Sequence, residues 1–152
     1  MSSFFNNYFF LVLAILAGVA MPTQAVVNGK LAATIANPIL AAFISFAVGT
    51  VALFVYILLT GIPLSDLATA RNAPPVAWIG GFLGALFVSV MATVAQRISV
   101  AIAFSLAIAG QMTITLLIDH FGWLGVEQKP INLMRVFGAV LITGGVVLIR
   151  RF

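Results

Sequence analysis

Five apolar runs, each long enough to cross a membrane, constrain the fold of this chain more than any other feature. They cover residues from about 8–27 or longer, 39–60, 76–95, 100–118 and 131–149. A helix rises about 1.5 Å per residue, so roughly 20 residues match the hydrocarbon core of a bilayer. Of the 152 residues 63% are hydrophobic and only 7% charged, a balance that soluble domains do not have. We therefore predict an all-α integral membrane protein, with residues 1–152 forming a single transmembrane domain in the lipid bilayer.

Charge and motif content exclude several classes of function. The charged residues lie almost wholly between the apolar runs, so the net charge of +4 describes loops and helix ends. Nucleic-acid binding would need a basic face with interleaved aromatic residues on a soluble fold. The chain has no cysteine, no paired intramembrane carboxylates and no hydrolase or phosphate-loop motif. We expect no enzyme, no catalytic residue, no cofactor, no metal site and no nucleic-acid partner.

The ends of the first two runs carry local signals. Residues 1–7 contain no Lys or Arg, and the first run exceeds the length of a signal peptide, so we expect it to be retained. The second run opens at Pro38, which suits a first helical turn. The longest loop, residues 61–75, contains three of the six prolines. Within it we predict a short interfacial helix over residues 64–67, with Ser65 or Asp66 as the cap.

Residues 21–30 are the least apolar part of any run. Pro22 removes a backbone donor and predicts a kink, and Thr23 or Gln24 would satisfy the carbonyl it frees. If the helix continues, Gln24 and Asn28 lie one turn apart on one face, with Lys30 on an adjoining stripe. Such amides commonly bond helices together. A kink, two amides and a cation in one stretch favour the lining of a cavity.

The later runs contain small residues at helical spacing and one further amide. Gly80 and Gly84 form a pair four residues apart, and Gly138 and Gly145 form a seam for close packing with a helix of the same chain or of a dimer partner. Gln111 lies deep in the fourth run, where binding a ligand and packing against a helix are both open roles. At four-residue intervals, the same face leads to Asp119 at the helix end.

The order of the polar and small residues supports a resemblance to a known family. The matching motifs are Pro22-Thr23-Gln24 with Asn28, Ser45-Phe46 with Gly49-Thr50, Gly80-Gly81 with Gly84, Arg97, Gly110-Gln111, Asp119-His120-Phe121-Gly122, and Arg135 with Gly138. Together they resemble the YdcZ-type family of the drug/metabolite transporter superfamily, over nearly the whole chain. The chain is more distantly similar to the small multidrug resistance transporters, in which an acidic residue of the first helix binds the cation and proton. The first run here has no carboxylate.

This resemblance implies a multi-pass protein of the bacterial inner membrane with half of a ten-helix transporter fold, completed by antiparallel dimerisation. We expect a small-molecule transporter with alternating access and an unknown substrate, for which a neutral or anionic metabolite is favoured. The alternative is a non-transporting membrane subunit that is active only as a heterodimer with a paralogue. Gln24, Asn28 and Gln111 are the expected substrate-binding residues, with Lys30 at the cavity mouth. Asp119 is a possible coupling residue, but it is not placed deep enough for tight proton antiport.

The basic residues predict how the chain inserts. With alternating spans, the side of the N-terminus receives three of them and the opposite side four; the first set is Arg71, Lys129 and Arg135, and the second is Lys30, Arg97, Arg150 and Arg151. The positive-inside rule scarcely selects an orientation from such a count. We therefore predict dual topology and an antiparallel homodimer. An antiparallel heterodimer with a paralogue, or a parallel dimer along the Gly138 and Gly145 seam, are the alternatives.

Overall fold

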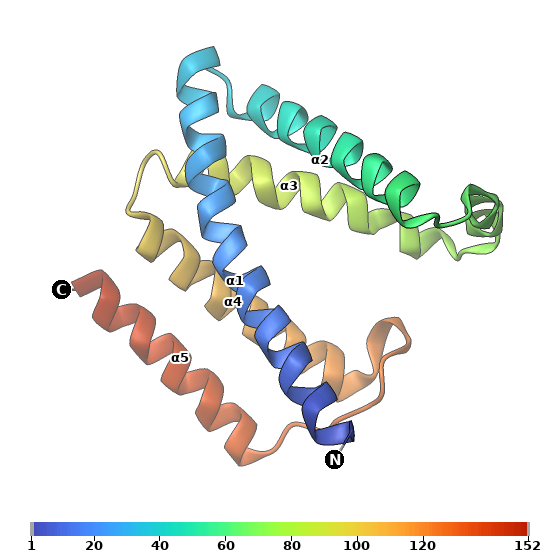
Figure 1. Cartoon of the computed structure of the whole chain (residues 1–152). Helices are drawn as coiled ribbons and strands as arrows, with labels where there is room; N and C mark the ends of the chain where they lie inside the picture. Colours follow the sequence, from blue (N-terminus) through green and yellow to red (C-terminus); the bar gives the residue numbers. More distant parts are fainter. Residues whose placement is uncertain (1, 152) are drawn as a thin grey trace. The chain divides into compact units, whose positions relative to one another are not determined.

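The computed structural model describes residues 2–151, and the side chains of residues 8–151. All regular structure in this range is helical (Figure 1). The elements are α1 (Ser2–Ile35), α2 (Pro38–Thr60), the 3-10 helices η1 (Leu64–Asn72) and η2 (Pro75–Trp78), α3 (Ile79–Val94), α4 (Val100–Phe121), the 3-10 turn η3 (Trp123–Gly125) and α5 (Leu133–Arg151). Five segments are long and apolar enough to cross a membrane, which confirms the predicted all-α class and its five spans.

The chain divides into two compact units. Met1–Arg97 holds α1, α2, η1, η2 and α3, and Ile98–Phe152 holds α4, η3 and α5. The first unit is a group of three long helices, and the second is a helical hairpin.

α1 runs without interruption through Pro22. The Thr23 hydroxyl donates to the carbonyl of Val19 at 2.9 Å, whereas the carbonyl that Pro22 deprives of its helical donor belongs to Gly18. Thr23 therefore does not take the predicted role. The apolar span of this helix, Tyr8–Ile35, has 28 residues and so extends about 42 Å, which exceeds the hydrocarbon thickness. The first span therefore continues past residue 27, as the prediction of 8–27 or longer allowed.

α2 starts where the sequence predicted. Asn37 is the N-cap, and its side-chain oxygen accepts from the backbone N–H groups of Ile39 and Leu40 at 3.0 and 3.1 Å. Pro38 fills the first helical position, where no N–H is needed. The helix ends at Gly61, whose φ of 70° is the left-handed conformation that glycine adopts without a steric penalty.

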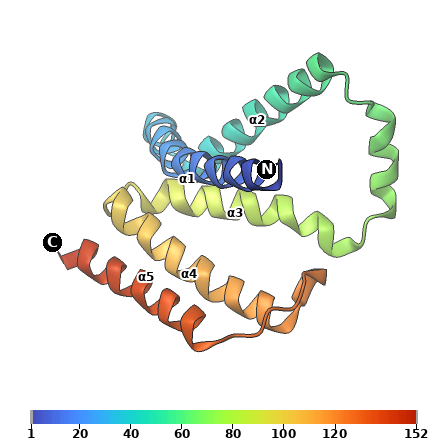
Figure 2. The same ribbon diagram turned by 60° about the horizontal axis from the view of Figure 1, so that its bottom comes forward.

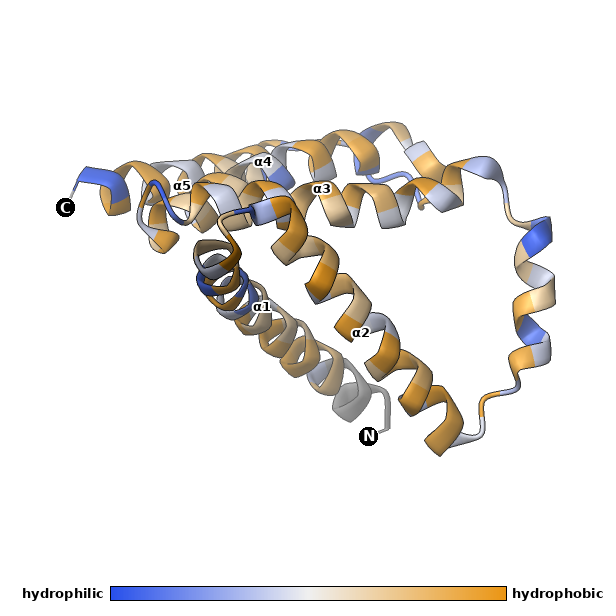
Figure 3. Ribbon diagram, turned by 90° about the horizontal axis from the view of Figure 1, so that it is seen from above, coloured by the Kyte–Doolittle hydropathy of each residue, from blue (hydrophilic) through white to orange (hydrophobic). Residues whose placement is uncertain are grey.

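The connection between α2 and α3 contains more helix than expected. The predicted interfacial helix at 64–67 is η1, which continues to Asn72 in 3-10 geometry. The predicted cap is wrong, because Pro63 occupies the N-cap position and no side chain caps the helix. Asp66 instead accepts at its backbone carbonyl from the Thr69 hydroxyl at 2.6 Å. Figure 3 shows the hydrophilic residues of η1 between largely hydrophobic helices.

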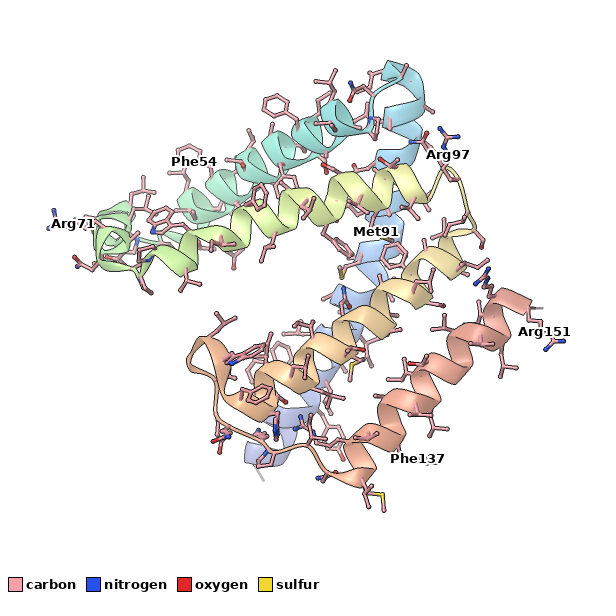
Figure 4. All side chains as sticks on the ribbon, turned by 180° about the vertical axis from the view of Figure 1, so that it is seen from behind. Phe54, Arg71, Met91, Arg97, Phe137 and Arg151 are labelled. Carbon is pink, nitrogen blue, oxygen red and sulfur yellow. The ribbon has the colours of Figure 1, made fainter. Side chains whose placement is uncertain are left out.

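The first unit is packed through small residues. Its buried side chains lie in the second half of α1, at the start of α2 and at the end of α3, and these helices contact one another pairwise. They are Ala25, Asn28, Ala32, Ala41, Ala42, Met91 and Ala92. Alanine lets helix backbones approach closely. α2 and α3 diverge from this region toward η1 (Figure 2), and Met91 marks the packed end of α3 in Figure 4.

Gly84 contributes to the packing of the first unit, whereas Gly80 does not. A Cβ atom at Gly84 would lie 3.6 Å from the Phe46 ring of α2, in ordinary contact. At Gly80 nothing described lies within 4 Å. Only one member of the predicted small-residue pair therefore faces another helix of its unit.

The second unit is built from α4 and α5, which run side by side in Figures 1 and 2. Gly122 caps α4 with a φ of 65°, and Asn132 caps α5 by accepting from the backbone N–H of Arg135 at 2.9 Å. Ala103 and Val146 are its buried residues. α4 extends to Phe121, so the predicted boundary of 118 falls one turn early.

Most of the spanning surface is exposed and apolar. Between 6% and 11% of the apolar window of each span is buried. Figure 4 shows Phe54 of α2 and Phe137 of α5 projecting outward, and both are about half exposed or more. Apolar surface on this scale marks contact with lipid or with another protein. Charged side chains such as Arg71, Arg97 and Arg151 lie instead at helix ends and connections (Figure 4).

Candidate functional site

A pocket with three polar side chains in a largely apolar lining lies between α1 and α2 in the first unit. Its volume is about 220 Å³, and it is lined by Gln24 of α1 and by Ser45, Phe46, Gly49, Thr50 and Leu53 of α2. Ser45 and Gly49 are one turn apart on one face of α2, as are Phe46 and Thr50. No described heavy atom lies within 4 Å of the place where a Cβ of Gly49 would be, so the space beside Gly49 is open.

The polar groups of this pocket are mostly free to bind a ligand. The Thr50 hydroxyl donates to the carbonyl of Phe46 at 2.8 Å, so its proton is used and its oxygen remains an acceptor. Among the described residues, the Gln24 amide and the Ser45 hydroxyl make no hydrogen bond. The lining contains no charged side chain.

Asn28 lies one turn beyond Gln24 on the same face of α1. Only 4% of it is exposed, and it is the one buried polar residue within the described part of the chain. Its side-chain nitrogen is buried without a hydrogen-bond partner there. An unsatisfied buried donor costs about 1–3 kcal/mol. Asn28 does not line the α1–α2 pocket, so its predicted contact with a substrate stays a prediction.

Lys30 is the third predicted residue of α1, and it is exposed. It forms no ion pair with any residue that the structure describes, and it does not line the α1–α2 pocket. Its place at the mouth of a cavity stays a prediction.

Gln111 is in α4, and its side chain is exposed. It therefore belongs to the second unit, and its predicted participation in one cavity with Gln24 and Asn28 stays a prediction. The pocket of the second unit, about 470 Å³ between α4 and α5, has an almost wholly apolar lining. Its hydroxyls, on Thr113 and Thr143, each donate to a carbonyl of their own helix at 2.9 Å.

Asp119 forms an ion pair with Arg135 within the second unit. Their side chains are 25% and 28% exposed, so the pair is largely shielded from solvent. Arg135 also donates to the carbonyl of Lys129 at 2.7 Å, and the Lys129 N–H donates to the carbonyl of Asp119 at 2.7 Å. The ion pair and these two hydrogen bonds, called the clamp below, hold the start of α5 to the end of α4. The predicted coupling role of Asp119 is untested, and its structural role is this clamp.

His120 ties the same connection to α4. Its Nδ1 accepts from the backbone N–H of Ile131 at 3.1 Å, and its carbonyl accepts from the Gln128 amide at 2.9 Å. The imidazole packs edge-on against Phe121. An acceptor role for Nδ1 places the proton of the neutral ring on Nε2. His120 is thus a residue of the helix end.

The predicted glycine seam of α5 is open within the second unit. No described residue of that unit lies within 4 Å of a Cβ placed at Gly138 or Gly145. The use of the seam by a dimer partner stays a prediction.

Ser45 and Thr50 are pocket residues that the sequence-based site did not include. The available signal was their presence in the Ser45-Phe46 and Gly49-Thr50 motifs of the family resemblance. A hydroxyl in an apolar run gives little warning by itself, because it can bond to its own helix as Thr50 does.

The fold and this pocket define a multi-pass membrane protein with an uncharged polar site in its first unit. A family model described as "Putative inner membrane exporter, YdcZ" matches residues 9–148, and the chain therefore belongs to the YdcZ family. The match confirms the predicted resemblance and a multi-pass location in the inner membrane. It supports a membrane transporter, a class distinct from enzymes. Neither the curated proteins nor the solved structures that were compared contain a match.

Proposed function

We propose that the protein transports small molecules by alternating access through an antiparallel homodimer. The observation that carries the proposal is the family match, which spans all five apolar helices. Five spans are half of a ten-helix transporter of the drug/metabolite transporter superfamily. Many transporters are built from two inverted halves, with the substrate near the midplane between them. Two copies of this chain in opposite orientations would supply both halves.

One feature of the chain supports the inverted arrangement, and two more support a dimer of either orientation. The near-equal count of basic residues on the two sides gives little orientation bias. The spans also leave most of their surface available for a partner. The seam of Gly138 and Gly145 is open within the second unit, so the helix of a partner in either orientation can approach α5 there.

The proposed substrate site consists of Gln24, Asn28 and Gln111, with Lys30 at its mouth. The unpaired amide nitrogen of Asn28 and the pocket position of Gln24 support this assignment. A second candidate function is a non-transporting subunit that pairs with a paralogue in an antiparallel heterodimer. The same weak charge bias favours it, because a partner of opposite bias would fix the orientation.

Liposomes that contain only the purified chain separate these two functions. They would be loaded with a defined mixture of neutral and anionic metabolites, and efflux would be followed by mass spectrometry against protein-free liposomes. We expect a subset of the solutes to leave. No efflux with this chain alone, together with efflux after co-reconstitution with a paralogue, would support the subunit function instead.

Variants test the residues in the same assay. Gln24→Ala and Asn28→Ala should each abolish the efflux while the protein still assembles. Gln96→Ala is the matched control, because the Gln96 amide, just after α3, donates to the carbonyl of Ala92 at the end of that helix at 3.0 Å. Unchanged efflux in both site variants would reject the assignment of Gln24 and Asn28.

A further inference from the structure

We propose that the pocket between α1 and α2 binds a neutral solute rich in hydrogen-bonding groups, with Ser45 and Thr50 as binding residues. The inference rests on the transporter function proposed above and names the substrate class of its site. Ser45 and Thr50 join Gln24 at one pocket although they are distant from it in sequence. Hydroxyl and amide compounds are the chemical class that these three side chains can recognise.

The absence of charge in the pocket argues for a neutral solute. No lining residue is ionisable, and neither α1 nor α2 contains an acidic residue. A charged group that enters a low-dielectric pocket needs a counter-charge, without which its burial is very costly. Lys30 does not line the pocket, so even at the mouth its charge lies outside the lining that would surround a bound solute.

The hydrogen-bonding capacity of the pocket further restricts the solute. Thr50 has used its proton, so it offers only an acceptor and requires a donor from the solute. Gln24 and Ser45 can both donate and accept. A hydroxyl or a primary amide both donates and accepts, so such groups satisfy every one of these side chains.

The volume limits the size of the solute. The pocket is small, with a volume of about 220 Å³. This is below the range of pockets for drug-sized ligands. Phe46 and Leu53 provide an apolar wall for a short carbon skeleton. A small polyol or amide fits these limits.

Two cysteine variants test whether the pocket admits neutral polar molecules. The chain has no cysteine of its own, so Ser45→Cys and Ala47→Cys each introduce a single thiol. Ser45 lines the pocket, whereas the exposed Ala47 lies two residues along and therefore on roughly the opposite side of α2. The reconstituted variants would be treated with iodoacetamide, which is neutral, or with iodoacetate, its anionic counterpart of similar size. A cysteine added after Phe152 normalises the intrinsic reactivity of the two reagents.

We expect the cysteine at position 45 to react faster than the cysteine at position 47. At position 45, the normalised reaction rate should be about tenfold higher or more with iodoacetamide than with iodoacetate, equivalent to about 1.4 kcal/mol. Equal rates at the two positions would overturn the pocket as a polar site. Equal rates with the two reagents at position 45 would overturn its selectivity for neutral solutes. This readout needs no flux, so failure here is distinct from failure of the transport proposal.

A matched threonine pair then tests binding. Thr50 and Thr60 both donate to the carbonyl four residues earlier at 2.8 Å, but only Thr50 lines the pocket. Thr50→Val should reduce the efflux of neutral solutes from loaded liposomes about two- to tenfold, the scale of one lost hydrogen bond, while Thr60→Val leaves it unchanged. Equal effects of the two substitutions would remove Thr50 from the site. Efflux confined to charged solutes would contradict the substrate class while leaving the transport proposal intact.

Discussion

Replacing Asn28 with Leu distinguishes a residue that holds helices together from one that is kept for a ligand. Leu has the same branched shape as Asn but no polar atoms. The Asn28 nitrogen is buried and unpaired among the described residues, and such a donor costs the folded chain about 1–3 kcal/mol. The free energy of unfolding of the Asn28→Leu variant should therefore exceed that of the parent by up to about 3 kcal/mol. It should also lose solute efflux.

Thermal unfolding in detergent measures the change in stability. For a chain of this size, 1 kcal/mol corresponds to roughly 2–4 °C, so the rise in Tm should be about 2–12 °C. Asn37→Leu is the matched control, and it should lower the Tm. The Asn37 side chain accepts two backbone N–H groups at the start of α2, and its loss should cost about 0.5–2 kcal/mol.

Two results would refute the reasoning about Asn28. A fall in Tm comparable with that of Asn37→Leu would show that Asn28 bonds helices together. A rise in Tm with unchanged efflux would show that the unpaired nitrogen has no part in the substrate site.

Further predictions concern the second unit. Asp119→Asn and Arg135→Gln should each lower the Tm. A double-mutant cycle should give a coupling energy of about 1–2 kcal/mol, which is intermediate between the values typical of surface and of buried ion pairs. Additive effects of the two substitutions would contradict the clamp. Asp119→Asn should not selectively abolish a pH-driven flux in liposomes, and if it did so with solute exchange intact, the expectation of facilitated transport or exchange would be wrong. Gly122→Ala should lower the Tm by an amount equivalent to about 1–2 kcal/mol, because φ is 65° there, whereas Gly110→Ala should not. Gly138→Leu should leave the chain folded but reduce dimer cross-linking in membranes, and an unchanged yield would exclude the seam from the interface.

The helix boundaries of α2 could be predicted because they are encoded locally. Asn37 and Pro38 satisfy the first turn, and Gly61 supplies the left-handed cap. η1 was harder to predict, because Pro63 replaces a side-chain cap and the helix has 3-10 geometry. α1 extends beyond 27 because Asn28 and Lys30 reduce its hydropathy without breaking its backbone hydrogen bonds. Polarity in a span is a signal about environment and does not end a helix.

The site was predictable only in part, because it depends on which helices meet. Gln24, which lines the pocket, and Asn28, which does not, were predicted from their spacing on α1. The hydroxyls of Ser45 and Thr50 become part of a site only through the approach of α2 to α1, which no local pattern reports. Asp119 was predicted from its spacing to Gln111, but its partner Arg135 is 16 residues away and is reached through a folded connection. Contacts of this kind depend on tertiary structure.

The orientation of the chain in the membrane tests the central claim, an antiparallel homodimer of one chain, most directly. A single cysteine placed after Phe152 in this cysteine-free chain would be labelled in intact cells with an impermeant thiol reagent. With three basic residues on one side and four on the other, insertion should occur both ways, and about half of the molecules should react from outside. Labelling of nearly all or nearly none of them would contradict the homodimer and favour a partner of fixed topology.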